Sequence, residues 1–157
     1  MQGIGRHTDY ASRVVFHLAV LGPGSRVQVK DIAERRLMPA PFVRRVVARL
    51  AAAGILRTTR GSGGGVQLAR PASTISMLDV VRAMEGGIVL NRCVSEPPAC
   101  PLSGACPVRL AWGDATRRVE EHLGGVTFAD ILKPPEQADH VEDLGSVRSA
   151  SRRRRKI

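Results

Sequence analysis

Apolar residues recur at spacings of three and four over the first third of the chain, which is the pattern of amphipathic helices. The first helix is predicted over residues 8–21, with Thr8 as its N-terminal cap. A shorter helix is predicted over residues 29–36. A third begins at Pro41, which suits the first position of a helix, and Gly54 is placed to end it in a left-handed conformation.

The pattern then changes to that of a β-hairpin. Residues 55–60 and 66–69 are predicted as two short strands, and the glycine-rich sequence 61–65 between them as a turn. The glycine run does not match a phosphate-binding loop, because it joins two strands and no Lys-Ser/Thr pair follows it. Two short helices followed by a hairpin predict a winged helix-turn-helix.

Helical spacing returns in the second half. A helix is predicted to begin at Ser76, with Asp79 at the capping-box position, and to end at two consecutive glycines. A long helix is predicted over residues 108–123, and a last short one over 127–133, capped by Thr127 with Asp130 three residues on. The long helix has a narrow apolar stripe, so it is expected to pack on its own domain or to pair with its copy in a dimer. The stripe consists of Val108, Ala111, Trp112, Ala115, Val119 and Leu123.

The predicted fold class is mainly α with a small β-hairpin. We divide the chain into a winged helix-turn-helix DNA-binding domain (1–85), a cysteine loop (86–107), a dimerisation helix with a short C-terminal helix (108–133) and a basic tail predicted to be disordered (134–157). No apolar run is long enough to span a bilayer and no signal-peptide core is present, so a cytoplasmic protein without membrane contact is expected.

Positive charge is concentrated in the predicted DNA-binding domain. The formal net charge is +10, and residues 1–71 carry twelve Lys/Arg against three Asp/Glu. A basic surface of this kind suits a polyanion such as DNA. On the third predicted helix, Arg44, Arg45 and Arg49 lie largely off the apolar stripe. They are therefore candidates for contact with bases or phosphates.

All three cysteines of the chain lie within fourteen residues, at Cys93, Cys100 and Cys106. An odd number of thiols in a reducing compartment argues against a structural disulfide and favours metal or redox chemistry. Thiolates are the usual ligands of iron–sulfur clusters, and two of these cysteines precede a proline, as in ferredoxin-type loops. Zinc also accepts three thiolates with one further ligand, although no Cys-x-x-Cys pair is present. Cluster, zinc site and metal-free thiols remain open on these grounds.

The order of these elements resembles the IscR/NsrR-type family of iron–sulfur winged-helix transcription regulators. The resemblance extends over about residues 5–133. It rests on the motifs Thr8-Asp-Tyr-Ala11, Arg60-Gly-Ser-Gly-Gly-Gly65 with Leu68 and Pro71, Asp79-Val-Val-Arg-Ala-Met-Glu85, and the three cysteines. It implies an iron–sulfur cluster on the cysteines, with a 4Fe-4S cluster favoured over 2Fe-2S.

Three cysteines leave a four-iron cluster one ligand short. In the cluster-biogenesis type of this family, a histidine follows the third cysteine by three residues, but this chain has Arg109 there. In the nitric-oxide-sensing type, an aspartate at the start of the first helix is donated by the partner subunit. Asp9 occupies the matching position here, so the resemblance is closest to that type. The other interpretation of Asp9 is a residue that only interacts with the helix dipole.

The resemblance also implies a homodimer bound to a palindromic operator in double-stranded DNA. It places Arg60 in a minor groove, with the wing glycines Gly61 and Gly64 beside it. One departure concerns the start of the recognition helix. Members of the family often have small polar residues there, whereas Met38-Pro-Ala-Pro41 offers no side-chain hydrogen-bond donor.

The predicted function is that of a transcription regulator, acting as a repressor, whose operator binding depends on a cluster that senses nitric oxide, redox or iron status. The alternative is a winged-helix regulator with a zinc site or a cysteine thiol switch and no cluster. An enzyme is not expected, because the sequence contains no Cys-x-x-Cys motif, no nucleophile–base pair and no cofactor fingerprint.

Overall fold

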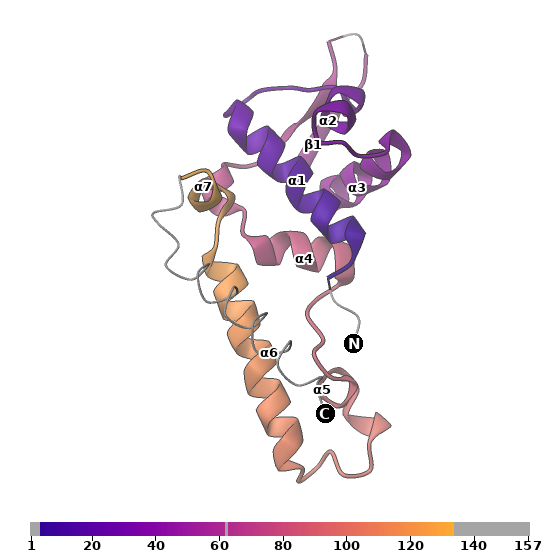
Figure 1. Cartoon of the computed structure of the whole chain (residues 1–157), viewed down its shortest axis with the longest axis vertical. Helices are drawn as coiled ribbons and strands as arrows, with labels where there is room; N and C mark the ends of the chain where they lie inside the picture. The colour runs from indigo at the N-terminus through magenta and orange to yellow at the C-terminus, as the bar shows by residue number, and fades with distance from the viewer. Residues whose placement is uncertain (1–3, 62, 134–157) are drawn as a thin grey trace, which may run out of the picture.

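The first helix, α1 (Arg6–Leu21), lies at the centre of the predicted winged helix-turn-helix domain (Figure 1). The computed structural model describes residues 4–61 and 63–133, so the predicted basic tail lies outside the described residues.

Side chains of α1 enter the core at helical spacing, as predicted, but Thr8 is not the N-terminal cap of this helix. Gly5 occupies the N-cap, and Thr8 is buried. Its hydroxyl donates to Glu85 Oε1 over 2.5 Å instead.

The second helix, α2 (Val29–Arg35), ends in a left-handed turn at Leu37, whose φ is 52°. The Leu37 N–H donates to the Glu34 carbonyl (3.3 Å), and the Met38 N–H donates to the Ala33 carbonyl (2.9 Å). This pair of bonds is the Schellman motif, which places one residue in the left-handed region and usually selects glycine for it. A residue other than glycine or asparagine pays roughly 1–2 kcal/mol for that conformation.

The third helix, α3 (Ala40–Ala52), ends in the same motif. The Gly54 N–H donates to the Ala51 carbonyl (3.0 Å), the Ile55 N–H donates to the Leu50 carbonyl (2.9 Å), and the φ of Gly54 is 71°. The predicted left-handed end at Gly54 is therefore confirmed. The predicted start was late by one residue, because the helix begins at Ala40 and its proline occupies the second position.

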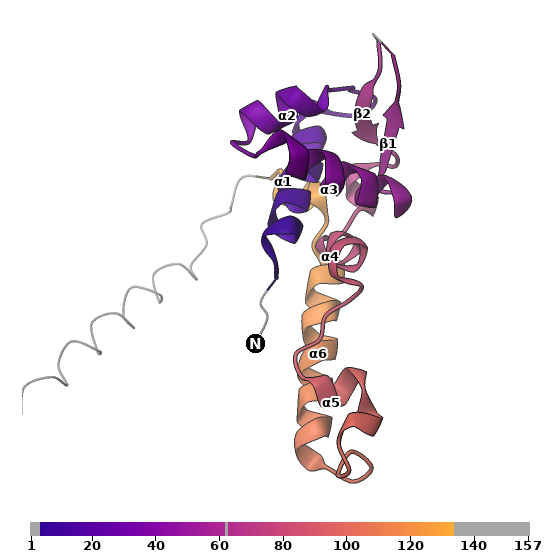
Figure 2. The same ribbon diagram turned by 90° about the vertical axis from the view of Figure 1, so that its right-hand side faces the viewer.

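The predicted wing is an antiparallel hairpin of β1 (Leu56–Thr59) and β2 (Gly65–Leu68), with Leu56 opposite Leu68 and Thr59 opposite Gly65. Val27, which precedes α2, pairs with Val66 through two backbone hydrogen bonds of 3.0 and 2.9 Å. The hairpin is thereby attached to the helix-turn-helix along one edge. Figure 2 shows both strands extending beyond α2 and α3 at the end of the molecule opposite α6.

After a short 3₁₀ turn, η1 (Ala72–Thr74), helix α4 (Met77–Glu85) crosses beneath α1 and α3 (Figure 1). The predicted capping box is present. The Asp79 N–H donates to the Ser76 hydroxyl oxygen over 3.1 Å, and the Ser76 N–H donates to the Asp79 carboxylate over 2.9 Å. Gly86 ends the helix in the left-handed conformation, as predicted.

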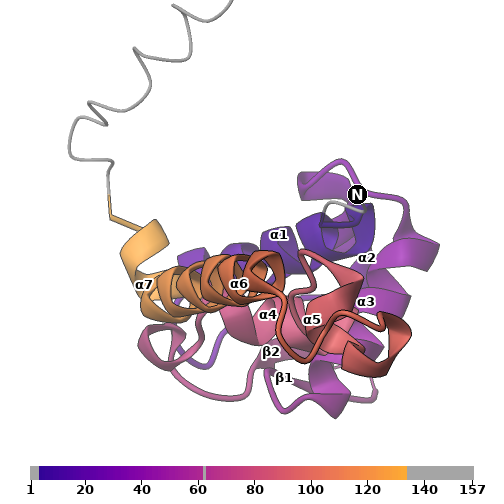
Figure 3. The same cartoon turned by 90° about the horizontal axis from the view of Figure 1, so that it is seen from below.

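The cysteine segment contains a short helix, α5 (Arg92–Ser95), and a 3₁₀ turn, η2 (Pro97–Ala99). The long helix α6 (Pro107–Gly125) follows and extends away from the DNA-binding domain, with α5 packed beside it (Figures 2 and 3). The chain then returns to that domain as α7 (Phe128–Ile131), which the predicted Thr127–Asp130 capping box begins. None of the helices in the described ranges could span a membrane.

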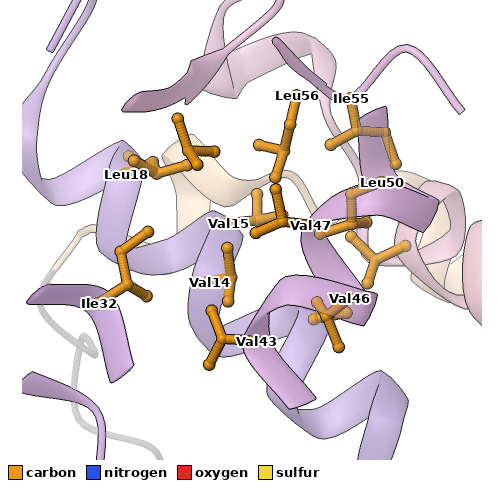
Figure 4. Close-up of a cluster of buried hydrophobic side chains, with 14 of the residues drawn as sticks. Val14, Val15, Leu18, Ile32, Val43, Val46, Val47, Leu50, Ile55 and Leu56 are labelled. Carbon is orange, nitrogen blue, oxygen red and sulfur yellow. The ribbon is translucent and has the colours of Figure 1, made fainter. Parts of the chain in front are cut away.

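One hydrophobic core lies between α1, α2, α3, the hairpin and α4 (Figure 4). Phe128 of α7 belongs to the same core, although it is more than forty residues from α4 in the sequence. The predicted fold class, a winged helix-turn-helix with a small hairpin and a long additional helix, is confirmed. The residues drawn in Figure 4 include Val14, Val15, Leu18, Ile32, Val43, Val46, Val47, Leu50, Ile55 and Leu56.

Candidate DNA interface and cysteine segment

The outer face of α3 carries the three arginines predicted to meet DNA. Arg44, Arg45 and Arg49 are exposed, because the helix turns its valine and leucine side chains into the core. The Arg45 guanidinium lies over the Phe42 ring, 4.5 Å from its centroid. That stacking restricts the side chain without neutralising its charge. The helix therefore presents a row of cations on the side away from the core.

The tip of the wing carries Arg60 directly after β1, where it is exposed to solvent. Its loop depends on glycine at two positions. Gly61 has a φ of 105°, and a Cβ at Gly64 would lie 2.2 Å from the Thr59 carbonyl oxygen. The Gly64 N–H donates to the Gly61 carbonyl over 3.0 Å, and its own carbonyl accepts from the Gln28 side chain over 2.7 Å. These contacts hold the loop that presents Arg60.

Ion pairs divide the described residues into two electrostatic halves. Of the twelve Lys/Arg up to residue 71, only Arg13 and Arg70 pair with a carboxylate. Between residues 72 and 133, by contrast, five of six do so, and five of the six ion pairs that they form join residues three or four positions apart. Uncompensated positive charge is thus concentrated in the first 71 residues, and half of it lies on α3 and the wing. It includes Arg57, exposed on β1, which the sequence analysis did not single out.

His17 is a buried residue without a place in either site. The Arg36 Nε–H donates to its Nδ1 over 3.1 Å. Burial, together with the charges of Arg36 and Arg35, lowers the pKa of His17, so the ring is neutral near pH 7.

The three cysteines lie at different points of one segment. Cys93 is in α5, Cys100 follows η2, and Cys106 is the N-cap of α6. All three are free thiols and are half-buried. In residues 4–61 and 63–133, no three His, Cys, Asp or Glu side chains converge closely enough to hold a metal ion. Within the described residues, the segment brings the thiols together in sequence but does not close them around a common point.

Arg109, at the position where one type of the family has a histidine ligand, fastens the segment to α6. Its Nε–H donates to the Cys93 carbonyl over 3.0 Å, and its Nη1–H donates to the Ser103 carbonyl over 2.9 Å. A guanidinium has no lone pair available for a metal, so this side chain cannot serve as a ligand. It instead joins both ends of the segment to the first turn of the long helix.

Asp9 lies in the first turn of α1 and is half exposed. Both of its carboxylate oxygens meet Arg13, one turn along the helix, at 3.2 and 3.0 Å. Within the described part of this chain it does not join the cysteines in a metal-holding group. An exposed intrahelical ion pair is worth only about 0.3–0.5 kcal/mol, so Asp9 is available to another partner at small cost.

The start of α1 is connected to the end of α4. Glu85, the last residue of α4, accepts hydrogen bonds from the Thr8 hydroxyl (2.5 Å) and from the Gly5 N–H (3.2 Å). Gly86 and Gly87 follow directly and lead into the cysteine segment. The turn that carries Asp9 and the beginning of the cysteine segment are therefore tied to one carboxylate. Sequence analysis missed this contact, because its partners are 77 residues apart.

The chain matches a sequence model of the Rrf2 family, described as an iron-dependent transcriptional regulator, over residues 4–134. The protein rrf2 of Nitratidesulfovibrio vulgaris is 33% identical over 124 residues, which cover 79% of this chain and 83% of that protein. Transcriptional regulators, and not enzymes, make up this family, so the prediction that the chain is no enzyme is confirmed.

Two solved structures of regulators share the fold. IscR of T. potens is 28% identical, with a TM-score of 0.69, and the match covers 88% of this chain and 91% of that one. CymR of Staphylococcus aureus, solved in an oxidized form, is 27% identical, with a TM-score of 0.65, and the match covers 85% and 98%. The nitric-oxide-sensing subtype stays a prediction. The family match and the shared winged helix place this chain in the Rrf2 family of DNA-binding transcriptional regulators.

Proposed function

We propose that the protein is a dimeric repressor whose affinity for a palindromic operator is set by an iron–sulfur cluster on Cys93, Cys100 and Cys106. The observation that carries this proposal is that every thiol of the chain lies on one segment, which Arg109 fastens to α6. A winged-helix repressor without a cofactor needs no such cysteine segment.

The donor set fits such a group. Thiolates are the standard ligands of iron–sulfur clusters, and all three thiols here are free, half-buried and outside any disulfide. Helix α6 begins at Cys106, where the exposed amides and the helix dipole favour a negatively charged ligand. The thiols do not converge in the chain alone, so ligand binding is expected to order the segment, as metal binding often does.

Asp9 of the partner subunit is the proposed fourth ligand. Among the described residues, the Asp9 carboxylate in the first turn of α1 pairs only with the exposed Arg13. The competing position, three residues after Cys106, holds an arginine. A bound cluster supplies a group that reacts with nitric oxide and oxidants. The choice of 4Fe-4S over 2Fe-2S, and of nitric oxide over redox or iron status as the signal, rests on the family resemblance.

The contacts of Glu85 suggest how the two halves communicate. Its carboxylate holds the N–H of Gly5 and the hydroxyl of Thr8, next to Asp9, while its backbone leads into the cysteine segment. A change in the position of that segment therefore acts on the first turn of α1. Because α1 packs directly on α3, such a movement reorients the recognition helix. Two-state control of this kind needs a ligand that binds one arrangement better than the other.

Helix α6 is the proposed dimer interface. It is nineteen residues long, yet none of its residues is buried within one chain. Val108, Trp112 and Val119, which share one face at spacings of four and seven, each expose more than a third of their surface. A second copy of the same helix would cover this stripe. In such a dimer the two α3 helices enter successive major grooves about 34 Å apart.

Replacing Cys100 with serine is expected to abolish cluster binding, because a serine hydroxyl is a poor ligand for iron at neutral pH and only two thiols remain. Anaerobically purified wild-type protein should carry about four iron and four sulfide per chain for a 4Fe-4S cluster. The variant should lose both, along with the visible absorption. Iron and acid-labile sulfide analysis, with spectra before and after nitric oxide, measures this.

The matched control for this experiment is Leu102→Ser, an exposed residue two positions further along the same segment. It should keep the cluster. Asp9→Ala should keep iron but change the spectrum and speed cluster loss. A colourless wild-type protein that contains zinc, or that responds to oxidants through its thiols alone, would establish the alternative function. Two observations favour that alternative. The half-buried thiols do not meet in a metal-holding group within the described residues, and the fold is shared with CymR in an oxidized form.

Replacing Arg60 with alanine is expected to weaken specific operator binding by about 1–3 kcal/mol, or roughly 5- to 150-fold, if the side chain occupies a narrow minor groove. The residue is exposed at the wing and forms no ion pair among the described residues, so its loss should not affect folding. Fluorescence anisotropy with a selected operator duplex at fixed salt measures the change.

Arg118→Ala is the control for charge. Arg118 is also exposed, and its replacement also removes one positive charge, but it pairs with Asp114 on α6, away from the wing and α3. Its operator affinity should change less than twofold. Equal losses for both variants would mean that Arg60 contributes only net charge and would transfer base recognition to Arg44, Arg45 and Arg49.

A further inference from the structure

Leu37 combines two features that rarely occur together. In residues 4–61 and 63–133 it is the one residue other than glycine with a positive φ, at 52°. It is also the most exposed of the large hydrophobic side chains described, with 91% of its surface accessible. A bulky residue in the left-handed region is an outlier that calls for a cause, and burial is not the cause here.

Gly54 shows what the fold requires at such a position. The same Schellman motif ends both α2 and α3, with equivalent hydrogen bonds, and α3 uses glycine. Met38, the residue after Leu37, is buried and supplies the apolar contact that the motif needs. The leucine side chain therefore does not stabilise the fold. We look for its role in a contact with a binding partner.

The position itself indicates what that is. Leu37 lies in the turn of the helix-turn-helix, three residues before α3, and the N-terminal residues of a recognition helix contact base edges in the major groove. Pro39 and Pro41 are exposed beside it and donate no hydrogen bonds, while Arg44 and Arg45 are one turn further along. The leading edge of the recognition helix is thus apolar. In the major groove, the apolar feature that distinguishes one base from the others is the 5-methyl group of thymine.

We propose that Leu37 is a specificity residue that packs against the 5-methyl group of one thymine in each operator half-site. The inference rests on the proposed function, which places α3 in the major groove. It adds which base is recognised there, thymine, and through which chemical group, the 5-methyl. It also accounts for the departure at the start of this helix: recognition by methyl contact needs no side-chain donor.

The experiment begins with the full chain, purified anaerobically. Binding sites are selected from random duplex DNA, and each dT of the selected half-site is then replaced singly by dU, which removes only the methyl group. One position should weaken binding about fourfold, the effect of burying roughly one methyl group. In Leu37→Gly, dT and dU at that position should bind equally, while Leu37→Met should keep the preference for dT.

Folding is controlled within the same set of variants. Glycine adopts the left-handed conformation without strain and no buried contact is lost, so Leu37→Gly should unfold at the same or a higher urea concentration than the wild type. Leu37→Asn, which also tolerates this conformation, gives a second test of methyl discrimination.

Two results overturn the proposal while leaving the proposed function intact: wild-type protein that shows no methyl-sensitive thymine, and a preference for dT that persists in both Leu37→Gly and Leu37→Asn. Selection of no sequence at all overturns it together with the proposed function. A Leu37 that instead binds an apolar protein partner gives the first of these results.

Discussion

Replacing Phe128 with alanine is expected to lower the free energy of unfolding by about 3–5 kcal/mol, the usual cost of removing a large aromatic side chain from a core. Phe128 is 1% exposed and belongs to the core formed by α1, α3 and the hairpin. Its N–H also donates to the Ile75 carbonyl over 2.9 Å. Urea unfolding followed by circular dichroism measures the change.

The control is Ile131→Ala, in the same short helix but with 38% of its surface exposed, which should cost less than about 1 kcal/mol. A small effect of Phe128→Ala would mean that α7 does not stabilise the DNA-binding domain. The expected large effect has a functional meaning. Phe128 holds the far end of α6 on the domain that contacts DNA. In the proposed mechanism, this contact would pass a movement of the cysteine segment to that domain through the second end of the helix.

Features set by residues three or four apart were predicted from the sequence. The capping boxes at Ser76–Asp79 and Thr127–Asp130 and the left-handed end at Gly54 are of this kind. Each depends on hydrogen bonds between residues one turn apart or on the backbone preference of a single residue, so the residue types alone predict it. The hairpin was predicted for the same reason, because its glycine turn joins strands that are neighbours in the sequence.

Features set by distant residues were not predictable. Thr8 has the right side chain for a helix cap, but its hydroxyl is taken by Glu85, and no periodicity reports a partner 77 residues away. Leu37 shows the opposite difficulty. The Schellman motif forms without the glycine that signals it, so only backbone geometry identifies the strained position.

The sequence predicted which residues belong to the candidate cluster site, but not how they are arranged in space. Spacing identified Cys93, Cys100 and Cys106 as a group, and the segment lies as predicted between α4 and α6. In the proposed function, the thiols converge only around the bound group and with a second chain present, and local sequence patterns report neither of these. The fourth ligand, Asp9, stays a prediction for the same reason.

Replacing Gly64 with alanine is expected to weaken specific operator binding by roughly 5- to 150-fold. A Cβ at this position would lie 2.2 Å from the Thr59 carbonyl oxygen, and backbone atoms cannot yield as a flexible side chain can. Overpacking of this kind typically costs about 1–3 kcal/mol, and 1.4 kcal/mol corresponds to a tenfold change in affinity. The strain falls on the end of β1, directly before Arg60, and therefore misdirects the residue proposed to enter the minor groove. Anisotropy titration with the selected operator measures the loss.

Gly63 provides a control one residue away. A Cβ there meets nothing within 4 Å, and its φ lies outside the left-handed region, so Gly63→Ala should bind the operator within about twofold of the wild type. Combining Gly64→Ala with Arg60→Ala separates two explanations. If the wing acts by presenting Arg60, the double variant should be scarcely weaker than the stronger single one. If the two losses add in full, Gly64 instead supports a contact of its own, made by the loop backbone that Gln28 holds in place.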